Sequence, residues 1–158
     1  MPIANVKGAM NSSGDYTLQN LSSQEIYDRA NAVQTIRTRF TVAEVNAGAT
    51  LLSAVAGFKY RMVDCFMIAV GGAAATATTV DVLATQSTSS VKLIANAVAG
   101  LTQSTVLRAG ATNSTVLADG ASFVANDANT AVTVGKTGGS LATATHIDVH
   151  FSYVLEPA

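Results

Sequence analysis

The sequence contains little charge, one cysteine, two prolines and no tryptophan. Charged residues make up 12% of its 158 residues, about half of the ~25% that an average soluble domain carries. A net charge of −1 creates no field that would gather phosphates, so we expect no binding to nucleic acid. The single thiol, Cys65, excludes an intramolecular disulfide and a cysteine zinc cluster. Its apolar neighbours predict a buried, inert side chain.

Long apolar runs are also absent. The longest run, residues 65–75, is shorter than the ~18 residues that a membrane-spanning helix needs. The first residues lack a charged region followed by a long apolar stretch, which predicts no signal peptide and synthesis in a reducing cytoplasm. Because hydrophobic residues reach 49%, the chain is not expected to be disordered and is long enough for one domain with a sizeable core.

Alanine, threonine and valine are abundant. Threonine and valine favour strands, and the alanines are interleaved with threonine, glycine and serine rather than with helix formers. Small side chains also allow sheets or chains to approach closely. Soluble monomers usually carry far more surface charge, so this composition predicts a homo-oligomer in which other polypeptides cover much of the surface.

Residues 1–33 differ from the remainder and are predicted to form an N-terminal arm. Ser22 followed by Glu25 has the spacing of a capping box, which predicts one short helix over residues 23–33. From Gln34 the apolar residues alternate with polar ones, as they do in strands. The sequence therefore predicts two parts, the arm at 1–33 and a β-domain at 34–158.

The β-domain is predicted to be an antiparallel β-sandwich or jelly roll of about eight to nine short strands, because short alternating segments are separated by turn residues. A ten-residue repeat, in which residues 104–112 are echoed by 114–122, predicts two adjacent strands with similar turns. The expected strands cover residues 34–42, 50–55, 58–70, 79–84, 91–95, 104–107, 115–117, 130–134 and 146–155.

Side chains with catalytic or metal-binding chemistry are few. His146, Asp148 and His150 point from one face of the last strand and could bind a metal with help from a neighbouring strand or chain, but the solvated or inter-subunit face of an amphipathic strand is the favoured interpretation. Residues 135–139 lack the full spacing of a phosphate loop and are predicted to form a turn. Three carboxylates could supply a glycosidase pair, but no pocket pattern surrounds them; they are Asp64, Asp81 and Asp119. We therefore expect no enzyme and no cofactor.

Basic residues recur at alternate positions in two of the predicted strands. Arg37 and Arg39 alternate in the first strand, and Lys59 and Arg61 alternate in a later one. If these strands are neighbours, their side chains form a basic stripe. Such a stripe is either an ordinary solvated face or, since charge is scarce elsewhere, a docking patch for an acidic partner.

The chain resembles the head decoration (cement) proteins of tailed bacteriophages. The resemblance covers most of the chain and is carried by its small-residue β-domain, in particular residues 58–64, 71–75 and 146–153. It implies a homo-oligomer, with a trimer favoured, on the outer surface of the virion. There the subunits clamp neighbouring major capsid proteins, often with an N-terminal arm. The arm's large apolar side chains would be its anchors, namely Tyr16, Leu18, Leu21, Ile26 and Tyr27.

An alternative is a recognition module, either a phage tail-tip or fibre domain or a carbohydrate-binding sandwich. Such modules grip sugar rings with exposed aromatic side chains. Two features count against this alternative: the chain has no tryptophan, and Tyr60 and Tyr153 are predicted to face the core.

Overall fold

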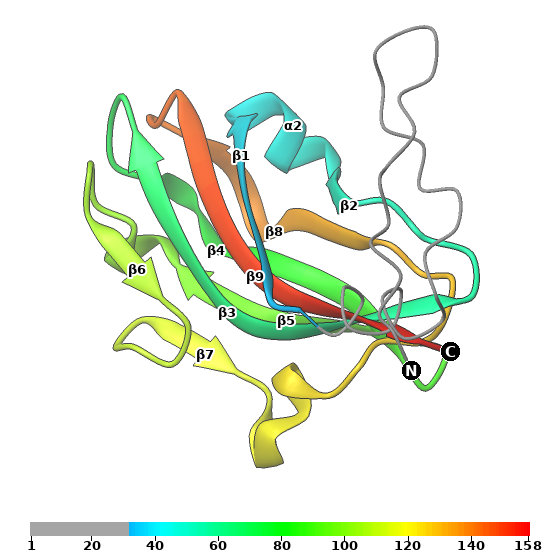
Figure 1. The fold of residues 1–158 in the computed structure, drawn as a ribbon. Coiled ribbons are helices and arrows are strands. Elements are labelled where there is room, and N and C mark those ends of the chain that lie inside the picture. Colours follow the sequence, from blue (N-terminus) through cyan, green and yellow to red (C-terminus); the bar gives the residue numbers. More distant parts are fainter. Residues whose placement is uncertain (1–31) are drawn as a thin grey trace, which may run out of the picture.

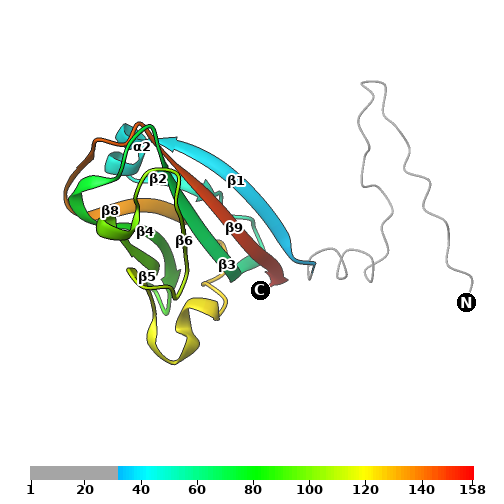
Figure 2. The same ribbon diagram turned by 90° about the vertical axis from the view of Figure 1, so that its left-hand side faces the viewer.

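The computed structural model describes residues 32–158. This part of the chain forms two antiparallel sheets that pack face to face (Figures 1 and 2), with strand orders β1-β9-β3-β6 and β2-β8-β4-β5-β7. The predicted all-β sandwich is confirmed, whereas its jelly-roll form stays a prediction. The elements are β1 (Gln34–Thr41), α2 (Val42–Ala47), β2 (Ala49–Leu52), β3 (Phe58–Val70), β4 (Ala75–Gln86), β5 (Ser89–Ala97), η1 (Val98–Gly100), β6 (Val106–Arg108), β7 (Ser114–Val116), η2 (Ala118–Phe123), β8 (Val132–Ala142) and β9 (His146–Pro157).

The centre of the four-stranded sheet is the long antiparallel pair of β3 and β9. In β9 the residues Ile147, Val149 and Phe151 are fully buried, as their alternation predicts. A bulge between Met62 and Asp64 inserts Val63 into β3 without an opposite residue, and its side chain is exposed. The bulge therefore shifts the alternation, so that both Met62 and Cys65 face inward.

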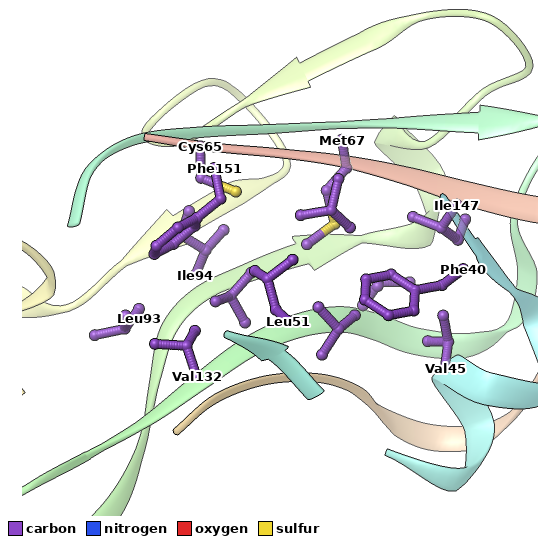
Figure 3. Close-up of a cluster of buried hydrophobic side chains, with 14 of the residues drawn as sticks. Phe40, Val45, Leu51, Cys65, Met67, Leu93, Ile94, Val132, Ile147 and Phe151 are labelled. Atoms are coloured by element: carbon purple, nitrogen blue, oxygen red, sulfur yellow. The ribbon is translucent and has the colours of Figure 1, made fainter. Parts of the chain in front are cut away.

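The core lies between the two sheets, where side chains from β3 and β9 face those from β5 and β8 (Figure 3). Burial raises the pKa of the Cys65 thiol to about 12, with a smaller contribution from the charge of Asp64. The prediction of a buried cysteine is thus confirmed. Tyr60 and Tyr153 are also buried, as predicted, and their rings meet edge to face at 5.3 Å.

The first described helix, α2, was not predicted from the sequence. Thr41 caps it, because its hydroxyl accepts a hydrogen bond from the Glu44 backbone N–H at 3.2 Å and its own N–H donates to Glu44 Oε2 at 2.7 Å. The hydrogen bond that the Thr41 backbone N–H donates to the carboxylate is the main reason why the pKa of Glu44 is lowered. The helix predicted over 23–33 lies outside the described residues except for Ala32 and Val33, which are not helical.

Residues 135–139 do not form the turn that their glycines predict. They lie inside β8, where the register with β4 shifts twice between Ala75 and Thr79. Gly138 has a φ of +82°, and a Cβ there would lie 2.4 Å from Thr78 Oγ1. Glycine is required because the strand bulges at close contact with its neighbour, so the glycines mark an irregular strand rather than its end.

The repeat of residues 104–112 and 114–122 yields strands in different sheets. The first copy provides β6, which pairs with β3 in the four-stranded sheet. The second provides β7, which pairs with β5 in the five-stranded sheet. The expectation of two adjacent strands is therefore wrong, because each copy finds its hydrogen-bond partner in a different layer.

The β4–β5 hairpin turns through Ser87 and Thr88, which both have positive φ values, 51° and 63°. This conformation suits an Asn-Gly turn and is strained for a β-branched residue. Asp127 holds the turn in place, since Oδ1 accepts the Ser87 N–H at 3.0 Å and Oδ2 accepts the Thr88 N–H at 2.7 Å. The carboxylate therefore supports a turn that its own residues disfavour.

Replacing Thr88 with glycine is expected to raise the free energy of unfolding by about 1 kcal/mol, because glycine adopts positive φ without steric cost. The substitution keeps the backbone N–H that binds Asp127. Urea denaturation measures the change. Thr50→Gly in β2, where no positive φ occurs, is the matched control and should lower stability. A loss of stability in Thr88→Gly would contradict this account of the turn.

Candidate functional site

The outer face of the four-stranded sheet gathers arginines from two strands that lie far apart in the sequence. The strand registers place Arg37, His150, Phe66 and Arg108 opposite one another in a single row across β1, β9, β3 and β6. Arg39 and Asp148 face each other in the next row. We call this surface the arginine face, and it consists of Arg37, Arg39, Asp64, Phe66, Arg108, Asp148 and His150.

Asp148 joins β9 to β1 through two arginines. Its carboxylate accepts hydrogen bonds from Arg37 Nη2 at 2.5 Å, from Arg39 Nε at 2.6 Å and from Arg39 Nη2 at 2.9 Å. The Asp148 side chain is only 3% exposed, whereas those of Arg37 and Arg39 are 56% and 50% exposed. Cationic groups thus cover a buried anion, and the arginines are the part that a partner would meet.

The electrostatics of this cluster favour the charged form of Asp148. The Arg39 hydrogen bond is the largest influence and holds the pKa of Asp148 well below its ordinary range, against the opposing effect of burial. In turn, the hydrogen bond to Asp148 raises the pKa of Arg39. Charged hydrogen bonds of this bidentate kind are short and directional, so they fix both guanidinium groups over the sheet.

Phe66 forms the centre of the second half of the arginine face. Its ring stacks on the His150 imidazole, with centroids 4.2 Å apart and planes inclined by 14°. The Arg108 guanidinium carbon lies 5.5 Å from the same ring, within cation–π range. Arg108 Nη2 also lies 3.4 Å from Asp64 Oδ2, although its side chain stays 60% exposed. Stacked planar groups therefore continue the surface that the Asp148 cluster begins.

The predicted basic stripe is only partly present. Arg37 and Arg39 lie together on β1, but β9 separates β1 from β3, which carries Lys59 and Arg61. Arg61 Nε instead pairs with Glu156 Oε1 at 2.5 Å. The strands were assumed to be neighbours, and the sheet order corrects that assumption. The five predicted arm anchors all lie outside the described residues: Tyr16, Leu18, Leu21, Ile26 and Tyr27.

Within the described residues, the side chains of the other chemical hypotheses do not assemble into a site. His146, Asp148 and His150 share one face of β9, but the Asp148 carboxylate is occupied by guanidinium groups where a cation would have to bind. Within residues 32–158 no three side chains with metal-ligand chemistry gather into a group. Asp64 and Asp81 lie on the outer faces of different sheets, so they cannot act as a pair on one bond.

Phe66 and Arg108 were not predicted from the sequence as site residues. Phe66 belongs to a run in which both faces of β3 are apolar, so nothing in the local pattern marked its outward position. Arg108 directly follows the strand expected over residues 104–107, in the first copy of the repeat. The available signal was that Arg108 is replaced by alanine at the corresponding position of the second copy.

No family model, curated protein sequence or solved structure matches this chain. Among the residues that the structure describes, no helix is long and apolar enough to span a membrane. The function is therefore inferred from the fold and from the arginine face.

Proposed function

We propose that this chain is a non-enzymatic structural protein of a tailed-phage head, a decoration subunit on the outer surface of the capsid. It forms a homo-oligomer, a trimer by the resemblance described above, and binds acidic regions of neighbouring major capsid proteins. The observation that carries this proposal is the arginine face, where Arg37, Arg39 and Arg108 are each at least half exposed although charge is scarce in the chain.

The size of the outer face of the four-stranded sheet supports a docking role. Four strands spaced ~4.8 Å apart and an eight-residue edge strand rising ~3.3 Å per residue span about 19 by 26 Å. This projected area of about 500 Å² would supply a large part of the ~800 Å² that each partner buries in a typical specific interface. Repeated by capsid symmetry, such contacts stabilise a shell without any single strong site.

The fixed geometry of the arginines also supports this role. Arginines that are already held by Asp148 and Phe66 lose little side-chain entropy when they bind carboxylates. The carbohydrate-binding alternative has weaker support, because Phe66 has His150 on one side and Arg108 on the other, and Tyr60 and Tyr153 are buried. These aromatic rings leave little free surface on which a sugar could stack.

Cosedimentation with empty shells, assembled from the major capsid protein of the same genome, tests the proposal. Arg37→Glu and Arg108→Glu are each expected to weaken binding by about tenfold or more, because each places a carboxylate against an acidic surface. Lys136→Glu on β8 of the other sheet carries the same charge change and should bind like the wild type. Added salt should weaken wild-type binding.

Two results would overturn the proposal: wild-type protein that does not sediment with shells, or Arg37→Glu and Arg108→Glu variants that bind as well as the wild type. Binding to a glycan array without binding to shells would favour the recognition module instead. Sedimentation velocity of the free protein tests the predicted trimer.

A further inference from the structure

One sheet edge stands out among the described strands. The edge strands of the five-stranded sheet, β2 and β7, have four and three residues, and β6 at one edge of the four-stranded sheet has three. The opposite edge is β1, with eight residues in unbroken register with β9. Figure 2 shows β1 on the outside of its sheet, with β9 and β3 beside it. A long, regular edge strand can accept a further strand.

The hydrogen-bond pattern determines which backbone groups of β1 are available. Val42 N–H donates to the Thr145 carbonyl at 3.3 Å, so this opposed pair is hydrogen-bonded. Bonded and non-bonded pairs alternate in an antiparallel ladder. Even-numbered residues of β1 therefore bond to β9, and the odd-numbered Thr35, Arg37 and Arg39 point their N–H and C=O groups outward. Thr41 N–H also points away from β9 and is capped by Glu44.

The usual protections of an edge strand are missing from β1. It contains no proline and no bulge. Its two charged side chains, Arg37 and Arg39, turn across the sheet towards Asp148 instead of extending over the edge. Natural edge strands of this length are normally guarded by such devices. Because residues 32–158 leave β1 unguarded, its edge is expected to be covered in the assembled state.

We propose that the β1 edge accepts an extended segment of a different polypeptide as an added antiparallel strand, with carboxylates opposite Arg37 and Arg39. The backbone groups of Thr35, Arg37 and Arg39 provide the hydrogen bonds. The guanidinium groups of Arg37 and Arg39 remain half exposed on the outer face and select acidic side chains there. The identification of this segment with part of a capsid protein rests on the proposed function, whereas the strand addition does not.

Charge disfavours a second copy of β1 as the added strand. In a dimer whose two β1 strands are antiparallel and related by a two-fold axis, the outer faces of both sheets lie on the same side. Odd-numbered residues of one β1 therefore lie opposite odd-numbered residues of the other. The two registers with the longest overlap place Arg37 opposite its own counterpart or opposite Arg39 of the other copy. Like charges directly opposite each other destabilise a strand pair, so carboxylates fit these positions better.

Proline at position 35 tests the proposal. Thr35→Pro removes an outward N–H while leaving the β1–β9 hydrogen bonds intact, and Thr35→Val is the matched control that keeps this N–H. The probes are shells of the major capsid protein and a short, blocked peptide that alternates valine with glutamate, compared with one that alternates valine with lysine. We expect the wild type and Thr35→Val to bind the glutamate peptide and the shells. Thr35→Pro should lose about tenfold or more in affinity.

Amide hydrogen exchange provides an independent readout. In the free chain, the Ile36, Thr38 and Phe40 amides should be protected, and those of Thr35, Arg37 and Arg39 should exchange rapidly. The glutamate peptide should slow exchange at these three amides. Protection of the Arg37 and Arg39 amides in the free protein would overturn the proposal. Protection that disappears on dilution would show that a second copy covers the edge, and protection that persists would show that residues 1–31 cover it.

The two proposals fail in distinguishable ways. If Thr35→Pro binds shells and the glutamate peptide like the wild type, strand addition is wrong while the decoration function stands. If the wild type binds the glutamate peptide at the β1 edge but not the shells, strand addition stands and the decoration function is wrong. Equal binding of the lysine peptide would contradict the role of Arg37 and Arg39 as selectors of acidic segments.

Discussion

Asp148→Asn is expected to lower the free energy of unfolding by about 3 kcal/mol at neutral pH. The wild-type carboxylate is 3% exposed and accepts three charged hydrogen bonds from Arg37 and Arg39. A hydrogen bond to a charged group contributes ~1.5–3 kcal/mol, and contributions within one cluster are not additive. An amide cannot accept all three bonds, and it leaves two neighbouring guanidinium groups without a counter-charge. Urea denaturation measures the difference.

The effect of Asp148→Asn depends on pH in a defined direction. The pKa of Asp148 is lowered in the folded state, whereas in the unfolded chain it is ~3.9. The carboxylate therefore contributes its full stabilisation above the unfolded pKa and loses it as the pH falls towards the folded pKa. The difference between wild type and variant should be large at pH ~7 and smaller at pH ~3. An equal difference at both pH values would contradict this account.

Glu156→Gln is the control for Asp148→Asn. Glu156 pairs with Arg61 at 2.5 Å, but their side chains are 24% and 39% exposed. Surface pairs of this kind contribute ~0–1 kcal/mol. A small change in Glu156→Gln beside a large change in Asp148→Asn would show that burial of the carboxylate, rather than ion pairing as such, makes the arginine cluster important for stability.

Phe151→Ala is expected to destabilise the fold by about 4 kcal/mol. Phe151 is fully buried in β9 and lies opposite Cys65 of β3. Its ring stacks on that of Tyr153, with centroids 6.1 Å apart. Figure 3 shows its ring between the two sheets. Removing a buried phenylalanine leaves a cavity that a close-packed interior fills only in part, at a cost of ~3–5 kcal/mol.

Thermal and urea denaturation both measure the loss in Phe151→Ala. Val106→Ala is the control, because Val106 is 53% exposed on β6 and should change stability by less than about 0.5 kcal/mol. A small effect of Phe151→Ala would mean that the sheets can close over the vacated volume, and that the core is less tightly packed than the described side chains indicate.

The sequence predicted the strands whose side chains alternate regularly and failed where local geometry departs from that alternation. The strands β1 and β9 were predicted close to their observed bounds because one face of each is apolar, and β3 because its second half is a long apolar run. Helix α2 was missed because Val42 continues the alternation of β1, although Thr41 and Glu44 carry a capping box. Sheet order could not be predicted, since it depends on pairing between strands distant in the sequence.

The candidate site was predicted in fragments. Arg37 and Arg39 were considered as a docking patch, and Asp148 was considered separately as a candidate metal ligand. The hydrogen bonds between Asp148 and the two arginines join residues that are distant in the sequence, so neither pattern predicts them. Phe66 and Arg108 could not be added because they face the same surface only after β6 pairs with β3. The pattern within each strand identified its functional side chains. The surface forms only when the pairing of the strands brings those side chains together.

The arrangement of β1 beside β9 has a consequence for the order of events during synthesis. Among the described strands β1 pairs only with β9, and Arg39 and Asp148 are separated by 109 residues. At 5–20 residues per second, a ribosome needs roughly 5–20 s to make the intervening chain. Until then β1 has no partner, so a nascent or interrupted polypeptide lacks the completed arginine face. Under the proposed function, only subunits that have been translated through β9 would present this face to a capsid.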